Sequence, residues 1–285
     1  MEQSFYFYAN PFQPRGEEAA RALFACLTMR GAKVYSHAYL ARRGVGTEAE
    51  LAALPRGVRA VVAFGGDGTL LRVAADAARQ GTALLGVHTG TVGFLMAGDA
   101  DAPEETAEAL LKPDYFLSVC PMLEIRFGGK RYLALNDLSL TRGEHPGVIE
   151  VLAQADGEQI CCSHGDGMVV STPLGSTAYA LAAGGPIIRP DTPCLLVTPL
   201  NARELLQRPV ILPLGARVTL LAHGRDRRRL QLAVDGQTLL PVTEEARVEI
   251  CLAREQARLL APPNRRFFTT LRKKQALWNQ QEEQE

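Results

Sequence analysis

Residues 58–87 place the tightest constraint on how this chain can fold. The run VRAVVAF at 58–64 predicts a buried strand, and the apolar spacing from Thr69 to Arg79 predicts an amphipathic helix that ends at Gly81. Ala83 to Val87 predicts the next strand. A strand, a helix and a strand in this order form a crossover, which implies a parallel sheet with helices on its faces. Ligands of such sheets bind at the carboxyl ends of the strands, and GGDG at 65–68 follows the first strand directly.

The rest of the chain first extends this pattern and then departs from it. We expect strands at Phe5–Ala9 and Val34–His37, helices at Glu17–Met29 and Ala102–Leu111, and a loop or irregular helix at 42–55. From about Ser118, short strand-like segments alternate with hairpin turns at Gly128-Gly129, Asp156-Gly157 and Asp235-Gly236. We therefore predict an α/β domain with a parallel sheet over 1–117 and a β-rich domain over 118–255. Residues 256–285 should return to the first domain, with a strand and then a helix over Phe267–Trp278 and a disordered end.

Charge and cysteine usage exclude several classes of function. Lys plus Arg and Asp plus Glu number 31 each in 285 residues, so the chain lacks the basic surplus that binds duplex nucleic acid or acidic membranes. The N-terminus has no signal-peptide pattern, and no apolar stretch reaches the roughly 20 residues of a membrane helix. The six cysteines are scattered without a CxxC pair, which is typical of buried thiols in a reducing compartment. We expect a cytoplasmic protein that binds neither nucleic acid nor membrane.

The loop GGDGT at 65–69 is the first candidate site. Its glycines let backbone N–H groups surround an anion, and the helix that follows directs its positive dipole end at the same place. We expect Thr69 to cap that helix and Arg72 to reach a phosphate from its first turn. Asp67 is the informative residue, because its charge would repel a phosphate and so requires another partner, such as a metal or a hydroxyl group. The alternative is that Asp67 only makes an Asx turn.

Two further segments combine polar and small side chains. The run GDGMVVSTPLGSTAYALAAGGPIIRP at 165–190 places four hydroxyl groups near glycines, which suits the sugar and base of a nucleotide, although each half alone is typical of a hairpin or turn. Asn136 and Asp137 follow an apolar strand and could read hydroxyls or a base edge, or simply form a turn. His88 and His164 border the Gly-rich segments, but the histidines lack metal-ligand spacing, so we predict no metal held directly by the protein. The run Arg225–Arg229 is expected to be a solvated hairpin end.

Together these motifs resemble the NAD kinase family, the ATP- or polyphosphate-dependent NAD kinases. The matching motifs run in order over nearly the whole chain: GGDGT at 65–69, GVHTGTVGFL at 86–95, LND at 135–137, the segment 165–187 and DGQ at 235–237. GGDGT alone is shared with diacylglycerol and sphingosine kinases, and the STPLGSTAY segment separates the NAD kinases from them. Two alternatives stay open: a lipid or polyol kinase, and a non-catalytic NAD(H)-binding sensor.

The resemblance implies transfer of the γ-phosphoryl group of ATP, or of a polyphosphate, to the 2′-hydroxyl of the adenosine ribose of NAD. Asp67 would be the general base, and Mg²⁺ would bridge the donor's oxygens. The donor phosphates would be held by Gly65, Gly66, Gly68 and Thr69. The implied NAD-binding residues are Asp67, Gly68, Arg72, Asn136, Asp137, His164, Asp166, Leu174, Thr177, Ala178, Tyr179, Ala180, Leu181, Ala182 and Gln237. In this family the NAD site lies between the two domains and is completed across a subunit interface, so a homodimer or homotetramer is implied.

Three places depart from the family pattern. His88 stands where the family has Asn, Leu174 replaces Thr or Ser, and residues 201–207 replace a Pro-His stretch. Leu174 can offer only a main-chain contact. Because none of these departures changes Asp67, we expect an active enzyme whose donor or substrate preference is altered at most.

Overall fold

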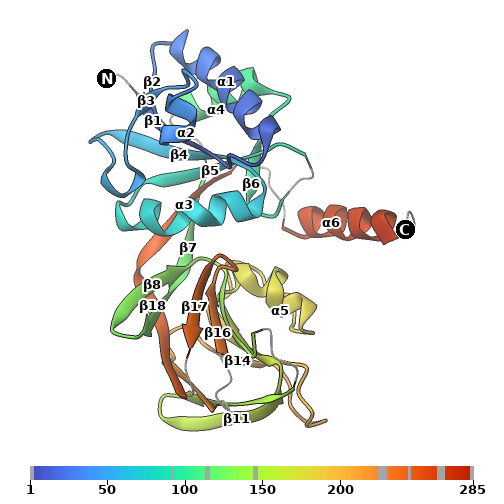
Figure 1. Ribbon diagram of the computed structural model, residues 1–285. Coiled ribbons are helices and arrows are strands. Elements are labelled where there is room, and N and C mark those ends of the chain that lie inside the picture. The colour runs from blue at the N-terminus through green and yellow to red at the C-terminus, as the bar shows by residue number, and fades with distance from the viewer. Residues whose placement is uncertain are drawn as a thin grey trace. The chain divides into compact units, whose positions relative to one another are not determined.

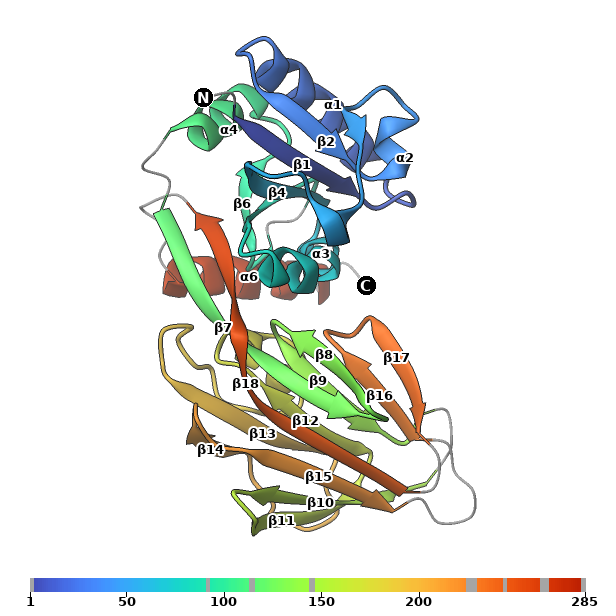
Figure 2. The same ribbon diagram turned by 90° about the vertical axis from the view of Figure 1, so that its left-hand side faces the viewer.

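The computed structural model describes residues 3–90, 93–112, 116–143, 147–223, 230–242, 245–261 and 267–282 (Figures 1 and 2). The chain divides into two compact units. The first consists of Met1–Val119 together with Ala257–Glu285, and the second of Cys120–Gln256. The domain boundaries predicted from the sequence lie after residues 117 and 255.

The first unit is a parallel sheet with helices on both faces, which confirms the predicted α/β fold class. In chain order its elements are β1 (Ser4–Ala9), α1 (Pro14–Thr28), β2 (Lys33–Ser36), α2 (Ala38–Ala41), β3 (Thr47–Glu48), the 3₁₀ helix η1 (Leu51–Ala53), β4 (Val58–Gly65), α3 (Asp67–Arg79), β5 (Ala83–His88), β6 (Met96–Asp99), α4 (Pro103–Leu111) and α6 (Phe267–Glu282). The strand order is β5-β4-β1-β2-β3, with β6 beside β5, and all of these pairs are parallel. Helices α1 and α4 cover one face of the sheet and α3 covers the other (Figure 1).

The crossover at 58–88 explains why this unit packs as it does. Strand β4 is buried from Ala60 to Gly65, as expected for a central strand of a parallel sheet covered on both faces. Helix α3 buries one stripe formed by Leu70, Val73, Ala74 and Ala77, at the i, i+3, i+4, i+7 spacing of an amphipathic helix. These elements therefore place the loop Gly65–Gly66 at the carboxyl edge of the sheet.

The structure refines one expectation about the first unit and contradicts another. Residues 42–55 are mostly turns and loop, as expected, and they also contain the two-residue strand β3 and the 3₁₀ helix η1. Phe267–Trp278 contains no strand, because α6 begins at Phe267 and continues to Glu282. The aromatic and Thr-rich start of this segment favours a strand on propensity alone, but its inward-facing residues recur at helical spacing. The end expected to be disordered is helical through Glu282, and residues 283–285 lie outside the described residues.

The second unit is built from antiparallel strands, as predicted. Its elements are β7 (Phe116–Phe127), β8 (Lys130–Ala134), β9 (Asp137–Thr141), β10 (Ile149–Ala155), β11 (Glu158–Gly165), β12 (Gly167–Ser171), the 3₁₀ helix η2 (Leu174–Thr177), α5 (Tyr179–Ala182), β13 (Cys194–Leu200), β14 (Val210–Pro213), β15 (Val218–His223), β16 (Leu230–Val234), β17 (Thr238–Val242) and β18 (Glu245–Ala261). One group of strands has the order β11-β10-β15-β18, with β7 beside β18 and β8 beside β7, and the other has the order β14-β13-β12-β9-β16-β17 (Figure 2). Buried side chains from both groups form one core, including Leu140, Met168, Leu220 and Val248.

The remaining expectations concern the hairpin turns, the cysteines, the basic run and membrane-spanning helices. The three predicted hairpin turns join β7 to β8, β10 to β11 and β16 to β17, and both central residues of each have positive φ. All six cysteines are free; four are buried, whereas Cys162 and Cys251 are half-buried. The basic run 225–229 lies outside the described residues. Among the helices that the described residues form, none is both long and apolar enough to cross a membrane.

The core of the first unit yields a stability prediction. Phe64 is fully buried at the end of β4, and its ring packs edge-on against Phe7 with centroids 4.9 Å apart. Phe64→Ala should lower the free energy of unfolding by about 3–5 kcal/mol, because it removes buried apolar contacts and leaves a cavity. Urea unfolding followed by circular dichroism measures this change. Phe12→Ala is the matched control, since that ring is 91% exposed, and an equal loss in both variants would contradict the assignment of Phe64 to the core.

Candidate active site

The start of helix α3 forms an anion-binding end. Gly66 is the N-cap residue, and as a glycine it has no side chain with which to cap the helix. Thr69 is therefore not the cap that the sequence suggested; it lies two residues inside the helix and is buried. The N-terminus of a helix carries the positive end of its dipole. Gly65 and Gly66 thus border a place where a phosphate oxygen is favoured.

The carboxylate of Asp67 is held by the second Gly-rich loop. The N–H of Phe94 donates to Oδ2 at 2.8 Å, and the N–H of Leu95 donates to Oδ1 at 2.9 Å. Gly93 permits this approach, since a Cβ atom there would lie 2.0 Å from Oδ1. An Asx turn within its own loop therefore does not describe these contacts of Asp67. The side chain is a fixed carboxylate that links two loops at the carboxyl edge of the sheet.

A cavity of about 420 Å³ lies beside this loop. Its lining includes Gly65 and Gly66 from the first loop, Thr89 and Gly90 from the second, and residues 12–15, which sequence reasoning missed. The available signal was the Asn10-Pro11 turn that ends β1, because β1 pairs in parallel with β4 and both strands end at this edge. Of these additional residues, Arg15 brings a cation, which makes a 3.4 Å contact with Asp101.

Two other residues near this edge differ from expectation. Arg72 is exposed and is the sixth residue of α3, so it lies beyond the first turn in which it was expected. His88, at the end of β5, has Nε2 3.7 Å from Oδ2 of Asp99. Its side chain therefore faces an acidic neighbour.

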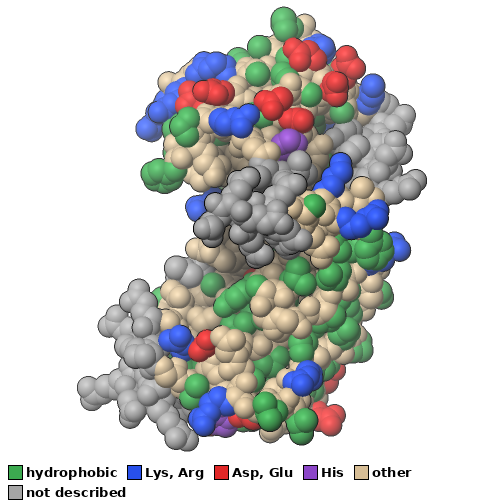
Figure 3. Space-filling view, turned by 90° about the vertical axis from the view of Figure 1, so that its right-hand side faces the viewer, with side chains coloured by type: hydrophobic (Ala, Val, Ile, Leu, Met, Phe, Trp, Pro, Cys, Tyr) green, Lys and Arg blue, Asp and Glu red, His purple; other side chains and the backbone are tan. Residues whose placement is uncertain are grey.

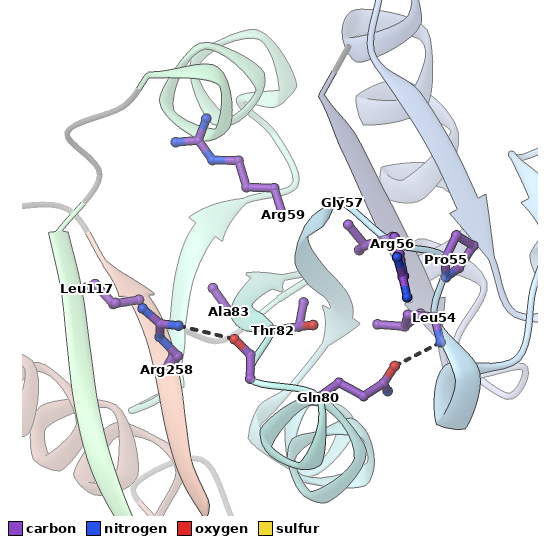
Figure 4. Close-up of a pocket in the computed structure, with 12 residues that line it drawn as sticks. Leu54, Pro55, Arg56, Gly57, Arg59, Gln80, Thr82, Ala83, Leu117 and Arg258 are labelled. Carbon is purple, nitrogen blue, oxygen red and sulfur yellow. Dashed lines mark hydrogen bonds between the residues drawn. The ribbon is translucent and has the colours of Figure 1, made fainter. Parts of the chain in front are cut away.

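A second cavity, of about 490 Å³, lies at the opposite edge of the same sheet (Figure 4). Its lining contains none of the sequence-predicted site residues, but it includes three arginines. Arg59 donates to the carbonyls of Leu111 and Lys112, and Arg258 donates to the carbonyl of Gly81 at 3.3 Å. Because ligands of parallel sheets bind at the carboxyl ends of the strands, we assign these two arginines to joining the segments around them.

In the second unit, Asp235 organises the segment 135–137. Its carboxylate accepts N–H hydrogen bonds from Leu135 at 2.9 Å, Asn136 at 2.8 Å and Asp137 at 3.1 Å. Burial raises the pKa of Asp235 to about 6, against the lowering effect of these three N–H groups. Burial, and then the charge of Asp235, raises the pKa of Asp137 to about 7. Burial therefore favours the protonated form of both carboxyl groups.

The segment 172–179 packs onto the same residues. Thr172 donates from Oγ1 to the carbonyl of Leu135 at 2.7 Å, and its N–H donates to the carbonyl of Asn136 at 2.9 Å. Gly175 lies against Asn136 so closely that a Cβ atom would be 2.1 Å from the Asn136 carbonyl oxygen. The N–H of Tyr179 donates to the Asp137 carboxylate. The fold thus brings the predicted residues of 136–137 and 174–179 into one cluster.

Asn136 of this cluster has a side-chain oxygen whose hydrogen bond is not made by any described residue. Its side chain is buried, and within the described residues its Oδ1 atom has no hydrogen-bond partner. A buried acceptor without a donor is costly, by about 1–3 kcal/mol. An N–H or O–H group of a bound molecule would remove this cost.

His164 and Asp166 form a separate group at the other end of β12. His164 has Nδ1 2.7 Å from Glu204 and Nε2 3.3 Å from Glu150. Asp166 accepts hydrogen bonds from Asn201 and Arg142, each at 2.7 Å, and these lower its pKa. Asp166 precedes the five residues of β12 and Thr172 follows them, so these two residues are separated by about 20 Å along the strand.

The remaining predicted residues are placed as follows. Leu174, Ala178, Leu181 and Gln237 are half-buried, Thr177 is buried, and Gly68, Tyr179 and Ala182 are exposed. Ala180 is fully buried in a small core with Val169 and Leu196, which leaves it no surface for a ligand.

Substitution of Asp137 should change how stability depends on pH. Because its folded-state pKa is raised from 3.8 to about 7, the folded chain keeps a proton that the unfolded chain loses between these values. This contribution to stability is fully present below about pH 4 and is lost as the pH rises through 7. The Asp137→Asn variant has no carboxyl group at this position and therefore does not lose this stability as the pH rises. Between pH 4 and pH 8, the free energy of unfolding of the variant relative to that of the wild type should increase by on the order of 1–4 kcal/mol.

Urea unfolding by circular dichroism at both pH values measures this difference. Asp191→Asn is the control, because Asp191 is an exposed aspartate paired with Arg189. Parallel pH profiles for Asp137→Asn and the wild type would contradict the raised pKa.

Both units match known proteins. Residues 7–115 match the ATP-NAD kinase N-terminal domain, and residues 135–261 match the ATP-NAD kinase C-terminal domain. The NAD kinase of Heliobacterium modesticaldum is 37% identical over 219 residues, which cover 75% of this chain and 77% of that protein. The NAD kinase of Syntrophotalea carbinolica is 33% identical over 274 residues, which cover 94% of this chain and 96% of that protein.

Two solved structures share the fold. Yeast NADH kinase complexed with NADH has a TM-score of 0.83 at 23% identity, covering 95% of this chain and 86% of its own. An NAD kinase from Archaeoglobus fulgidus in complex with ATP has a TM-score of 0.74 at 21% identity, covering 95% of this chain and 99% of its own. With two matched domains and relatives at least 33% identical over most of both chains, this chain belongs to the NAD kinase family.

Proposed function

We propose that this chain transfers the γ-phosphoryl group of ATP to the 2′-hydroxyl of the adenosine ribose of NAD, and so makes NADP. The observation that carries the proposal is the geometry of Asp67. Its carboxylate is fixed by two N–H groups at the end of a parallel strand, beside a cavity lined by Gly65 and Gly66. A general base must be held within hydrogen-bond reach of the proton that it removes. Family membership supports the choice of NAD as the acceptor.

The donor is assigned to the cavity beside Gly65 and Gly66. The N-terminus of α3 favours the negative charge of phosphates, and the loop backbone can approach them closely. The described residues contain no group of three or more His, Cys, Asp or Glu side chains that could hold a metal ion. We therefore propose that Mg²⁺ arrives bound to the triphosphate as part of the donor. A polyphosphate could present the same oxygens, so both donors belong in the first assay.

The acceptor is assigned to residues of the second unit. The unpartnered Oδ1 of Asn136 can accept a hydrogen bond from the amino group of an adenine. Asp137, whose raised pKa lets it carry a proton near neutral pH, can donate to or accept from a ribose hydroxyl. We assign the nicotinamide end to Asp166, whose carboxylate is held in place by Arg142 and Asn201.

The chemical step follows from these assignments. The 2′-hydroxyl gives its proton to Asp67 while its oxygen forms a bond to the γ-phosphorus. The bond from that phosphorus to the bridging oxygen breaks, and ADP leaves with the electron pair. Phosphoryl transfer depends on positioning and charge stabilisation more than on covalent help, which suits a site made of one base and backbone N–H groups.

We further propose that the enzyme is a homodimer or homotetramer that supplies NADP in the cytoplasm. Leu205, Leu206 and Ile211 are exposed on or before the edge strand β14, and Figure 3 shows hydrophobic side chains among the surface residues of the second unit. Exposed apolar side chains on an edge strand suit contact with a second copy. Light scattering after size-exclusion chromatography measures the mass in solution. The free thiols suit a reducing compartment.

The direct test uses purified protein with Mg²⁺, each donor and each acceptor. We expect NADP from NAD and ATP, and no phosphorylation of diacylglycerol. Asp67→Asn should reduce kcat by about 10²–10⁴, because the amide cannot take the proton, while NAD binding measured by calorimetry is retained. Turnover of this variant at the wild-type rate would remove Asp67 from the mechanism. Absence of NADP with every donor would leave the NAD(H)-binding sensor as the better account.

Gly93 provides an independent test of how Asp67 is positioned. A methyl group at 93 would meet the Asp67 carboxylate, so Gly93→Ala should displace it and lower kcat by about 10- to 100-fold. Gly215→Ala is the matched control, because a Cβ atom there meets nothing within 4 Å. Steady-state rates of NADP formation compare the two variants. Equal rates would show that the close approach at Gly93 does not matter to the reaction.

A further inference from the structure

Helix α6 carries a lysine on its inward face. Phe267, Thr270, Leu271 and Lys274, at the i, i+3, i+4, i+7 spacing of one helical face, are half-buried or buried. The other residues with described side chains, at 268, 269, 272, 273, 275 and 276, are exposed. Basic residues normally occupy the solvent face of such a helix, as Arg272 and Lys273 do here. The inward position of Lys274 therefore needs a specific partner.

That partner is the proposed general base. The Lys274 ammonium lies 3.1 Å from Oδ2 of Asp67, and only 18% of the Lys274 side chain is exposed. The same nitrogen lies 4.2 Å from the centre of the Phe94 ring, within the range of a cation–π interaction. Residue 94 also donates its N–H to Oδ2 of Asp67. The cation, the base and the second Gly-rich loop thus meet at one carboxylate oxygen.

A permanent ion pair would oppose the function of a general base. A neighbouring cation favours the charged form of a carboxylate, whereas the base must become neutral when it takes the proton. In the proposed reaction the negative charge on Asp67 disappears as the 2′-hydroxyl proton arrives. The attacking oxygen that released this proton is then bonded to phosphorus, so the anionic phosphoryl oxygens lie within a few ångströms of Asp67. Lys274 loses one anionic partner and has another within reach of its flexible stem.

We propose that Lys274 binds the transferring phosphoryl group, and that its contact with Asp67 is the arrangement before the donor phosphate arrives. This inference rests on the proposed function. An ammonium group has three donors, so Lys274 can turn one toward a phosphoryl oxygen without leaving the Phe94 ring. It keeps all its protons throughout: Asp67 receives the proton, the 2′-oxygen gains the phosphorus, and ADP leaves with the electron pair. Lys274 adds a fixed positive charge where the reaction develops negative charge.

The test compares Lys274→Met, Lys274→Arg and the control Lys273→Met in the full chain. Lys274→Met should lower kcat/KM for ATP by about 10- to 100-fold, while KM for NAD and the melting temperature stay at wild-type values. Lys274→Arg should recover most of the loss, because it restores the charge. Lys273→Met should behave as the wild type, since that side chain is exposed.

A binding measurement separates this inference from the proposed function. Equilibrium dialysis with Mg²⁺ and ATP, without NAD, should show about 10-fold weaker ATP binding to Lys274→Met than to Lys273→Met. Absence of NADP formation by the wild type would refute the proposed function, whereas equal ATP binding and equal kcat/KM in these two variants would refute the role of Lys274. Two further outcomes would refute the role of Lys274, because each would indicate a purely structural role. One is a loss of kcat/KM that Lys274→Arg does not restore, and the other is an equal effect of Lys274→Met on KM for NAD.

Discussion

The two hydrogen bonds from Phe94 and Leu95 to the Asp67 carboxylate are the interaction on which the candidate active site depends. Parallel pairing of β4 with β5 ends both strands at one edge, where Gly65 lies opposite His88. The carboxylate then joins the loops that leave these strands. A hydrogen bond to a charged acceptor is stronger than one between neutral groups, so the conformation of the second loop and the direction of the base depend on each other. The tight contact at Gly93 follows from the same interaction.

In the second unit, too, a carboxylate accepts backbone N–H hydrogen bonds and fixes a loop. Asp235 accepts three backbone N–H groups and so holds the segment that carries Asn136 and Asp137. Burial raises the pKa of both carboxyl groups, and the charge of Asp235 raises that of Asp137 further. One carboxyl serves as a structural anchor, and its neighbour becomes a group that can hold a proton near neutral pH. Such a group suits a hydroxyl that both donates and accepts.

The crossover, the hairpins and the polar loops could be predicted from sequence because each depends on a short pattern. Apolar spacing determines whether a segment buries one helical stripe or two strand faces, and paired residues with positive φ determine a tight turn. Where local preferences conflicted with packing, prediction failed. Phe267 and Phe268 favour a strand by residue type, yet they begin a helix whose spacing suits a buried face.

The sequence by itself determined the fold class and the family resemblance, and it singled out Asp67 as the candidate base, because these follow from the types and spacing of residues that lie close together in the chain. Only the tertiary structure decided which distant groups surround them. Asp67 meets N–H groups 27 and 28 positions further along and a lysine 207 positions away, and Asp235 holds N–H groups 98 to 100 positions before it. Such contacts depend on how helices and strands pack, and a hydrogen bond needs its donor and acceptor within about 3 Å. A one-dimensional pattern carries no distance between such segments.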